Sequence, residues 1–284
     1  MDYTQLPRSQ EDGLPIMKVG AWARKKYVRV WMYDHLFATG MKRKWDERVY
    51  VDLFAGPGLS RIRRTSDVLY GSPLLALTLP DRFDRYVFCE KNVPYLEALK
   101  ARVAQLAPAV DARYVAGGAD ENVGEILGHI PAASPTHKVL TFVFVDPFSV
   151  DFRFETIRQL AKRFTDFLLV LALQMDAKRN LESYLKPSND RIANFLDDPD
   201  WRPKWREAKR RGRSLTWFLA TEYAGAMERL GFLRTPLERM YPVKSDNKRL
   251  PLYYLAFFSR NELGYTFWDE VLKYTGDPEL DLRS

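Results

Sequence analysis

The chain has 284 residues, of which 46% are hydrophobic and 14% aromatic, so a packed core is expected and global disorder is excluded. A single cysteine, Cys89, excludes an internal disulfide, and together with only three histidines it excludes a zinc finger or an iron–sulfur site. No apolar run reaches the length of a bilayer span, and the first residues are polar and acidic. We therefore expect a cytoplasmic protein without a metal site or a membrane segment.

The charge balance is modestly basic. Lysine and arginine number 44 against 37 aspartates and glutamates, which gives a net charge of +7. This excess fits either an ordinary solvated protein or one with a polyanionic partner such as nucleic acid, and the clustering of the charge decides between them.

Helical and strand patterns alternate over the first 174 residues. Residues 1–17 are expected to form a flexible arm, and apolar spacing predicts a helix over 19–39. Strands are predicted at 49–54, 86–89, 112–116, 139–145 and 167–173, and the helices that follow the first four begin near Ser72, Tyr95, Val123 and Phe154. The strands lack alternation of apolar and polar residues, which is typical of strands covered on both faces. The sequence therefore predicts an α/β fold with a doubly wound, largely parallel sheet.

The pattern changes after residue 174. Residues 175–235 are charged, carry tryptophans and are predicted to be a helical insertion. Residues 238–243 and 252–259 return to strand character, which predicts a closing β-hairpin and a sheet of about seven strands. We expect a cofactor-binding core over 18–174, and a completion of that core by the hairpin and a C-terminal helix over 236–284.

Candidate site residues follow the strands, because ligands of doubly wound sheets bind at the carboxyl ends of the strands. The first strand ends in a turn with Asp52, Gly56 and Gly58, where glycines allow the backbone to approach a ligand closely, although an ordinary turn has the same composition. Glu90 ends the second strand and can accept hydrogen bonds from ribose hydroxyls. Asp120, after the third strand, can accept from an adenine amino group or cap the next helix.

The glycine turn differs from a dinucleotide site. Arg61 stands where the third glycine of that fingerprint is expected, and the next helix begins only near Ser72. A pyrophosphate binds directly at a helix N-terminus, whereas a ligand without phosphate, such as S-adenosylmethionine, has no such requirement.

The fourth strand ends in Asp146-Pro147-Phe148. These residues resemble the Asp/Asn-Pro-Pro-Tyr/Phe signature of amino-methyltransferases. Asp146 and the Pro147 carbonyl can accept from an exocyclic amine, and Phe148 can stack on a base. A simple strand terminus followed by a turn is the alternative interpretation.

The segment VDLFAGPGLS resembles the first motif of class I S-adenosylmethionine-dependent methyltransferases, in which Asp52, Phe54, Gly56 and Gly58 would contact the cofactor. From about residue 18 to 275 the chain resembles the three-Cys-motif partner protein family (TcmP). The matching pieces are Trp22 with Lys25 or Lys26, YVDLFAGPG, GSPLLAL, Asp120-Glu121-Asn122, FVDPFS, LYYLAFFS and Phe267-Trp268. The resemblance implies a Rossmann-like methyltransferase fold, S-adenosylmethionine as cofactor, and a separate partner protein that bears a three-cysteine motif.

Two basic segments are candidates for substrate contacts. One is an inserted loop after the first strand, with Arg61, Arg63 and Arg64, and the other is the stretch 201–213, with Lys204, Arg206, Arg210 and Arg211. Arginine and lysine bind phosphates, and tryptophans can stack on bases. The alternative is a solvated loop and a solvated helix face, because Trp201 and Trp205 are four residues apart and would share one buried face.

Three functions remain open from the sequence. The first is a methyltransferase that acts on nucleic acid, at a base amino group or a similar acceptor. The second is a non-catalytic nucleic-acid-binding module on the same fold, and the third is a methyltransferase or accessory factor for a partner protein.

Overall fold

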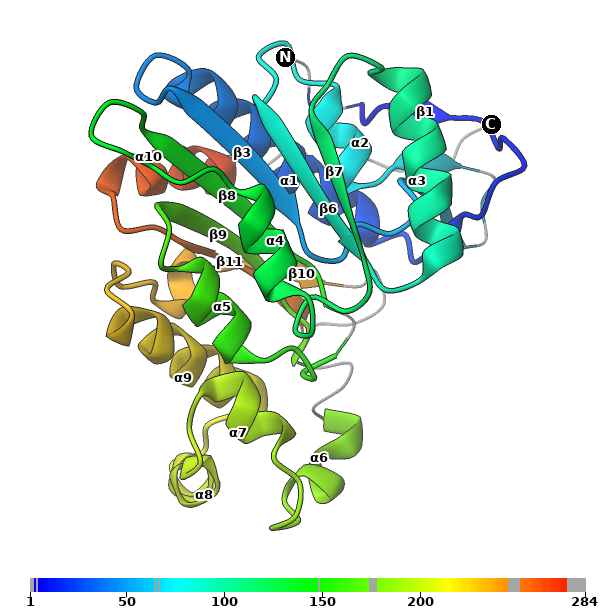
Figure 1. The fold of residues 1–284 in the computed structure, drawn as a ribbon. Coiled ribbons are helices and arrows are strands. Elements are labelled where there is room, and N and C mark those ends of the chain that lie inside the picture. The colour runs from blue at the N-terminus through cyan, green and yellow to red at the C-terminus, as the bar shows by residue number, and fades with distance from the viewer. Residues whose placement is uncertain are drawn as a thin grey trace.

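The computed structural model describes residues 3, 5–63, 65, 67–147, 149–173, 178–244 and 251–274. Its centre is a seven-stranded sheet (Figure 1). The strands lie side by side in the order β10 (Tyr241–Lys244), β11 (Pro251–Phe258), β9 (Thr165–Leu171), β8 (Val139–Val145), β3 (Glu47–Asp52), β6 (Arg85–Glu90) and β7 (Ala112–Ala116).

Five strands of this sheet, β3, β6, β7, β8 and β9, are parallel. β3 pairs with β6 on one side and β8 on the other, and β7 and β9 extend the sheet outward from these neighbours. When the parallel strands are counted from one to five along the chain, they lie side by side in the order 3-2-1-4-5, as in doubly wound folds. β11 is antiparallel to both β9 and β10 and closes the sheet as a hairpin. The predicted fold class is confirmed at the level of architecture: a doubly wound α/β sheet of seven strands, with a helical insertion before the closing hairpin.

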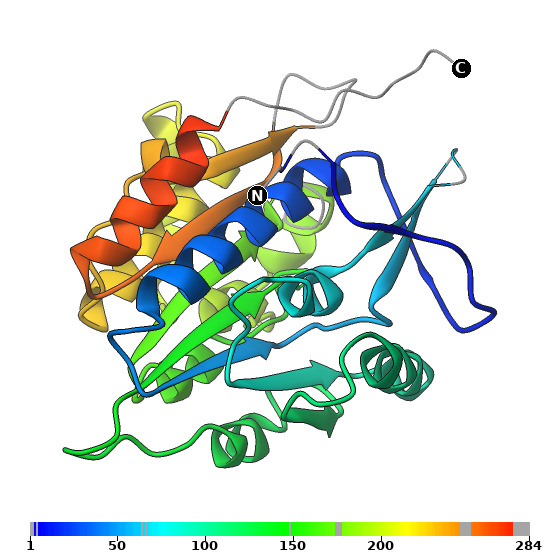
Figure 2. The same ribbon diagram turned by 90° about the horizontal axis from the view of Figure 1, so that it is seen from above.

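Helices cover both faces of the sheet (Figure 2). Alternate residues of β3 serve two separate cores, with Tyr50 in one and Val49 and Val51 in the other. The Tyr50 core is covered by α1 (Ala23–Met41), α2 (Ser72–Leu77), α3 (Val93–Leu106) and α10 (Glu262–Lys273). The opposite core is covered by α4 (Val123–His129), α5 (Phe154–Leu160), α7 (Arg191–Leu196), α8 (Trp201–Arg210) and α9 (Leu215–Arg229). All residues of β8 and β9 are buried, which explains their continuous apolar runs.

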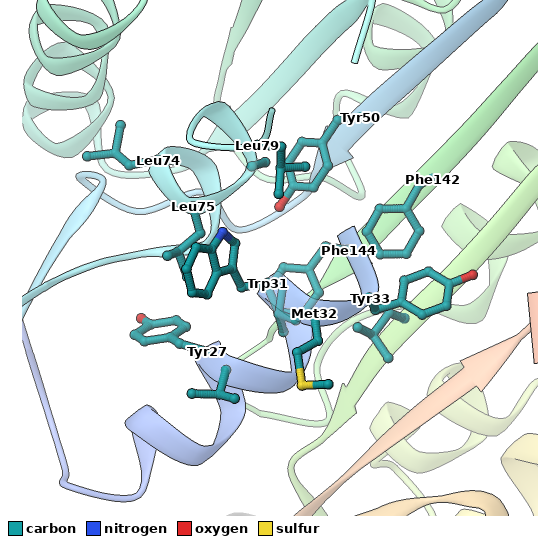
Figure 3. Packing of buried hydrophobic residues seen from close by; sticks show 14 of the residues in the cluster. Tyr27, Trp31, Met32, Tyr33, Tyr50, Leu74, Leu75, Leu79, Phe142 and Phe144 are labelled. Carbon is teal, nitrogen blue, oxygen red and sulfur yellow. The ribbon is translucent and has the colours of Figure 1, made fainter. Parts of the chain in front are cut away.

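The long helix α1 lies across the Tyr50 face, and its aromatic side chains fill the space above the strands (Figure 3). The Tyr33 ring lies 5.2 Å from the Phe142 ring of β8, and Trp31 donates from Nε1 to the Thr78 hydroxyl behind α2. Because this helix is enclosed on most sides, its charged residues Lys26 and Asp34 are also buried. Buried ionisable side chains are often found at functional sites. A buried charge is costly unless it has a partner, so the partners of these residues are of interest.

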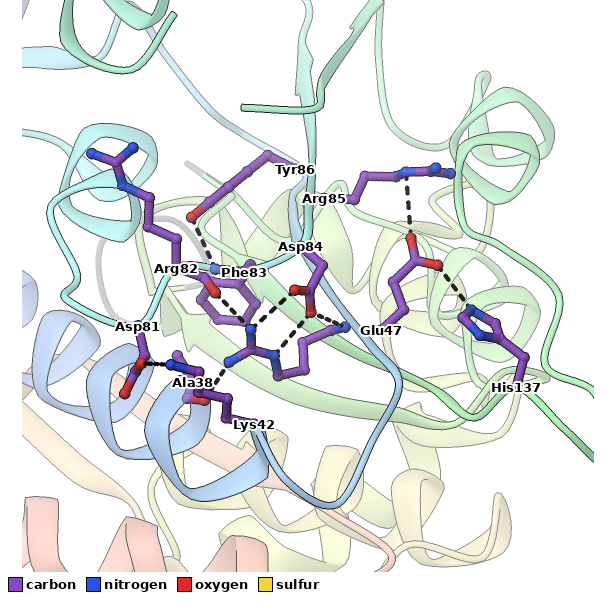
Figure 4. Close-up of polar contacts among 11 residues, drawn as sticks. Ala38, Lys42, Glu47, Asp81, Arg82, Phe83, Asp84, Arg85, Tyr86 and His137 are labelled. Carbon is purple, nitrogen blue, oxygen red and sulfur yellow. Dashed lines mark hydrogen bonds and ion pairs between the residues drawn. The ribbon is translucent and has the colours of Figure 1, made fainter. Parts of the chain in front are cut away.

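Ion pairs fasten the amino edge of the sheet (Figure 4). Arg48 of β3 donates to both oxygens of Asp84 at 2.9 and 3.1 Å, and to the Ala38 carbonyl of α1 at 2.6 Å. Glu47 accepts from His137 at 3.1 Å and pairs with Arg85. The end of α1 is thereby held at the amino edge, so its first turns lie at the carboxyl edge.

A second, four-stranded sheet forms where the sequence predicts an arm and a loop. Its order is β1 (Arg8–Ser9), β5 (Val68–Tyr70), β4 (Leu59–Ile62) and β2 (Met17–Val19). The inserted loop predicted around Arg61 and Arg63 is wrong, because β4 and β5 form an antiparallel hairpin with Leu59, Ile62 and Leu69 buried. The helix predicted to begin at residue 19 begins at Ala23, because Met17–Val19 pair with β4. Strands of two to four residues are too short to show a period in the sequence.

Helices α6 (Lys178–Tyr184) to α9 lie between β9 and the closing hairpin, in the segment where the sequence predicts a helical insertion. A 3-10 turn (Leu237–Arg239) leads into β10. Figure 1 shows that α6, α7 and α8 extend beyond the sheet on one side. In the described part of the chain, none of the helices combines the length and the apolar character needed to cross a bilayer.

Candidate functional site

The turn after β3 depends on two glycines and on hydrogen bonds within the turn and to β6. Gly56 and Gly58 have φ angles of +61° and +83°, which L side chains rarely adopt. Asp52 is fully buried, and its Oδ1 accepts from the Phe54 amide at 3.1 Å, so this carboxyl holds the turn. The turn amide of Ala55 donates to the Cys89 carbonyl of β6 at 2.9 Å.

Glu90 lies directly at this turn. Its Oε2 accepts from the Gly56 amide at 2.8 Å, and its Oε1 accepts from the Asn92 amide at 2.7 Å. Each oxygen of an ionised carboxylate has two lone pairs, so both can accept a further bond from a ligand hydroxyl. The structure therefore brings together Asp52, Gly56 and Glu90, which the sequence places on two separate strands.

Asp120 makes a different contact from either of those considered in the sequence. Its carboxylate accepts from the Arg153 amide at 3.2 Å and from the Thr156 hydroxyl at 2.5 Å, so it caps α5. The residue at the N-cap of α4 is Asn122, whose side chain donates to the Gly118 carbonyl. Burial raises the pKa of Asp120. Its predicted contact with adenine stays a prediction.

Asp146 ends β8 and forms an ion pair with Lys26 of α1. The Lys26 side chain is 5% exposed and the Asp146 side chain 23% exposed, so the pair is open to solvent only on the Asp146 side. Burial is the largest single influence and disfavours the charged form of Lys26, but Asp146, Tyr27 and Asp52 together outweigh it and raise the lysine pKa. Pro147 is buried, and Phe148 lies outside the described residues.

Three carboxyl groups meet at this edge. Burial raises the pKa of Asp52 to about 7, the Ser72 hydroxyl opposes this by donating a hydrogen bond, and the charges of Asp146 and Glu90 contribute to the rise. Lys26 balances the charge of Asp146, so the acidic character of this edge comes from Glu90 and Asp52. Cys89 offers no competing nucleophile, because burial raises the pKa of its thiol to about 12.

The arginines after β3 are only partly available. Arg61 forms an ion pair with Glu11, whereas Arg63 is exposed and Arg64 lies outside the described residues. Their hairpin packs against the N-terminal strands rather than forming a free loop.

Helix α8 presents a basic face with buried tryptophans. Trp201 is fully buried and Trp205 is 5% exposed, so both anchor the helix and neither is available to stack on a base. Lys204 pairs with Asp198, and Arg210 and Arg211 both pair with Glu207. Arg206 is exposed, and no partner for it is found in the described part of the chain.

The two basic groups lie far apart. In Figure 1, α8 is at the opposite corner of the molecule from β1, which pairs with β5, the second strand of the Arg61 hairpin. The structure therefore does not bring Arg61 and Arg63 together with the α8 residues. Their predicted role in substrate binding stays a prediction.

Sequence reasoning missed Arg102 of α3, which ties the N-terminal segment to the glycine turn. Its guanidinium donates to both oxygens of Asp12 at 2.6 and 2.8 Å, to the Pro15 carbonyl at 2.9 Å and to the Pro57 carbonyl. It is 4% exposed. The sequence offers one sign that Arg102 is buried: it lies between Leu99 and Val103, on the apolar face of α3.

The chain matches no family model and no curated protein sequence. Among solved structures it is similar to Trm1 from Pyrococcus horikoshii in complex with S-adenosyl-L-methionine, with 11% identity, a TM-score of 0.42, and coverage of 94% of this chain and 64% of that one. It is also similar to magnesium protoporphyrin IX methyltransferase from Synechocystis PCC 6803 with bound SAH, with 10% identity, a TM-score of 0.42, and coverage of 84% and 86%. A geranyl diphosphate methyltransferase in complex with sinefungin is 13% identical, with a TM-score of 0.39 and coverage of 88% and 91%. These likenesses concern the fold.

Proposed function

We propose that this protein is an S-adenosylmethionine-dependent methyltransferase that acts on nucleic acid. The observation that carries the proposal is the meeting of Asp52, Gly56, Glu90 and Asp146 at the carboxyl ends of β3, β6 and β8. This edge is where doubly wound folds bind their ligands.

The residues at this edge fit the cofactor. Glu90 offers carboxylate lone pairs to ribose hydroxyls, and the cluster of carboxyl groups suits a positively charged sulfonium. At Gly56 a Cβ atom would meet only the terminal Cε of Met17, at 3.0 Å, so the turn stays open on that side. S-adenosylmethionine supplies an electrophilic methyl group when bound. The resemblances to class I methyltransferases and to the TcmP family agree with this assignment.

Asp146 is the residue proposed to bind the acceptor. Its side chain forms an ion pair with Lys26, and a carboxylate oxygen accepts hydrogen bonds. An acceptor amine that donates an N–H to Asp146 is held with its remaining lone pair free. Alignment of a reacting pair lowers a barrier by roughly 7–11 kcal/mol, so orientation is a large contribution that these residues can make.

Nucleic acid is the proposed substrate because of the basic surface. Arg206 and Lys209 of α8 are exposed, and Arg213, just after this helix, lies 4.7 Å from the Trp217 ring, and cationic side chains of this kind contact a sugar–phosphate backbone. A separate protein with a three-cysteine motif remains the alternative acceptor, on the strength of the TcmP resemblance.

The test separates cofactor binding from transfer. S-adenosylhomocysteine is titrated calorimetrically into the wild type and into Asp146→Asn, and methyl transfer from labelled S-adenosylmethionine is followed into RNA, DNA and protein fractions. We expect both proteins to bind S-adenosylhomocysteine, and only the wild type to label nucleic acid. Absence of binding heat at millimolar ligand contradicts the enzyme assignment, and label in the protein fraction alone favours the partner-protein alternative.

A further inference from the structure

An exposed pair of aromatic rings lies at the amino edge of the large sheet. Phe164, which precedes β9, is 61% exposed, more than any other large hydrophobic residue in the described part of the chain. The other large hydrophobic residues that are exposed there are aliphatic: Leu14, Val93 and Leu185. The Phe164 ring lies 5.6 Å from the ring of Trp45, which precedes β3 and is half-buried. A single exposed hydrophobic side chain is common, so the surroundings of this pair decide whether it is a site.

Backbone hydrogen bonds of the sheet hold the two rings in place. The Asp46 amide donates to the Lys138 carbonyl at 3.0 Å, which joins the turn before β3 to the segment before β8. The Thr141 amide of β8 donates to the Phe164 carbonyl at 2.8 Å, which joins β8 to the segment before β9. Three connections that are far apart in the sequence therefore meet here in a fixed arrangement.

The same three connections carry positive charge without acidic partners. On residues 42–46, 131–138 and 161–164, five basic side chains have no ion-pair partner among the described residues: Arg43, Lys44, Lys138, Lys162 and Arg163. Lys42 differs from these, because it pairs with Asp81 (Figure 4). Asp46 is the only acidic residue on these connections, and its Oδ2 accepts from the Lys138 amide at 2.7 Å. Positive charge therefore surrounds the ring pair.

Arg260 adds a further cation beside Arg163. It follows β11, whose end lies at the amino edge because β11 is antiparallel to β9. Its guanidinium lies 4.1 Å from the Phe232 ring and donates to the Leu230 carbonyl at 3.0 Å and to the Arg163 carbonyl at 3.5 Å. These contacts hold the cation in place and leave it without an acidic partner among the described residues.

This surface is distinct from the proposed cofactor site. The glycine turn and Asp146 follow the carboxyl ends of β3 and β8, whereas Trp45 and Lys138 precede the amino ends of the same strands. β8 has seven residues, and a strand rises about 3.3 Å per residue, so the two edges are roughly 20 Å apart. A ligand at the ring pair does not occupy the carboxyl edge.

We propose that the ring pair and its five unpaired cations form an amino-edge surface that binds single-stranded nucleic acid. A base stacks on the exposed Phe164 ring, and the cations on either side contact the phosphates. Bases inside a duplex are already stacked on one another, so the ring favours an unpaired strand. Stacking needs only the flat face of a base, so the surface accepts different sequences.

An anionic membrane fits this surface less well. Membrane-bound surfaces insert several apolar side chains below the headgroups. On residues 42–46, 131–138 and 161–164, Phe164 is the only large hydrophobic side chain that is exposed. The inference does not depend on the methyltransferase assignment, because it uses none of the residues at the carboxyl edge.

The test compares a labelled single-stranded oligonucleotide with the matching duplex, by fluorescence anisotropy at several salt concentrations. The variants are Phe164→Ala, Phe164→Trp and the double variant Arg43→Ala/Lys162→Ala. The matched control is Lys100→Ala/Arg113→Ala, which removes the same charge from α3 and β7. Thermal unfolding and calorimetric titration of S-adenosylhomocysteine are measured for each protein, and binding to phosphatidylserine vesicles is measured by sedimentation.

We expect Phe164→Ala to weaken single-strand binding by about fivefold or more, because one stacked base is lost, without a change in duplex binding or in the salt slope. Phe164→Trp should keep the wild-type affinity. The Arg43 and Lys162 double variant should lower the slope of log affinity against log salt by about 0.7 for each lost phosphate contact, and the control should keep it. The unfolding temperature of Phe164→Ala should stay within a few degrees of the wild type, because the ring is largely in solvent.

The outcomes separate this surface from the other proposed sites. No single-strand binding, an unchanged affinity in Phe164→Ala, or equal losses for single strand and duplex overturns the proposal. An unchanged affinity in Phe164→Ala would mean that binding takes place elsewhere, as on α8. Vesicle binding that depends on Phe164, without single-strand binding, assigns the surface to a membrane instead. A wild type that binds the single strand through Phe164 but binds no S-adenosylhomocysteine supports the surface and contradicts the methyltransferase assignment.

Discussion

The Gly56 amide donates to the Glu90 carboxylate at 2.8 Å, which links the turn after β3 to the end of β6. This bond joins the glycine turn to the carboxyl group proposed to bind ribose. Glu90 also accepts from the Asn92 amide, just before α3, so its orientation is fixed from both sides.

Replacement of Glu90 by alanine should therefore weaken cofactor binding. Hydrogen bonds to a charged group contribute about 1.5–3 kcal/mol each, so we expect the affinity for S-adenosylhomocysteine to fall by at least tenfold. Calorimetric titration measures the change. The control is Glu97→Ala, an exposed residue of α3 that pairs with Lys100, and equal losses in both variants would contradict the assignment.

The buried carboxyl of Asp52 should make stability depend on pH. Its pKa is about 7 in the folded protein against 3.8 as the ordinary value. Between pH 4 and 7 the folded state retains a proton that the unfolded chain releases, so this contribution to the free energy of unfolding falls as pH rises and is constant above the folded pKa. A shift of about 3 units corresponds to about 4 kcal/mol at most.

Urea unfolding of the wild type and Asp52→Asn from pH 4 to 8 tests this sign. Asp166, whose pKa burial also raises to about 7, contributes with the same sign in both proteins, so the difference between them isolates Asp52. We expect Asp52→Asn to gain stability relative to the wild type as pH rises through this range. A difference that does not vary with pH would show that Asp52 is ionised throughout.

The two glycines of the turn should respond differently to alanine. At Gly58 a Cβ atom would lie 3.0 Å from Leu99 Cδ1 and 3.1 Å from Leu74 Cγ, whereas at Gly56 the only contact is the flexible end of Met17. A positive φ costs alanine about 1–2 kcal/mol at both positions, and overpacking adds about 1–3 kcal/mol at Gly58.

Thermal unfolding should therefore rank Gly58→Ala below Gly56→Ala. The control is Gly128→Ala in α4, where a Cβ meets nothing within 4 Å and alanine favours the helix. Equal losses at Gly56 and Gly58 would show that backbone strain alone governs this turn.

Arg102 should hold the N-terminal segment in place. Arg102→Met removes donors to the Asp12 carboxylate and to the Pro15 and Pro57 carbonyls. Loss of partners for such groups costs about 1–3 kcal/mol each when they stay buried. We expect faster limited proteolysis within residues 5–19 and a lower unfolding temperature, and neither effect in Arg113→Met, an exposed arginine of β7. An unchanged cleavage rate would mean that β1 and β2 hold the segment without Arg102.

The α8 face should contribute to nucleic-acid affinity through charge. Replacement of Arg206 and Lys209 by alanine should weaken RNA or DNA binding and reduce the slope of log affinity against log salt by about 0.7–0.9 for each lost phosphate contact. Fluorescence anisotropy at several salt concentrations measures both quantities. A double alanine variant of Lys100 and Arg113, with the same loss of charge, should keep the wild-type slope, and an equal fall in both would indicate a general charge effect.

The parallel core could be predicted from local features of the chain. The apolar runs of β8 and β9, the glycine turn and the acidic residues that end β3 and β6 are local features, and the rule that parallel strands end at one edge predicts that the turn and Glu90 meet. The helical character of α8 and the buried side of Trp201 and Trp205 also follow from spacing alone.

The contacts between distant segments could not be predicted in this way, because they depend on how the elements pack. Lys26 and Asp146 are 120 residues apart, and Asp12 and Arg102 are 90 apart, so no local period predicts that either pair meets. The four-stranded sheet depends on the pairing of strands too short to leave a pattern, and the Asp120 contact with α5 depends on where that helix packs. The physical reason is that hydrophobic periodicity determines which face of an element is buried, whereas charged and polar partners are set by the packing of whole elements against one another.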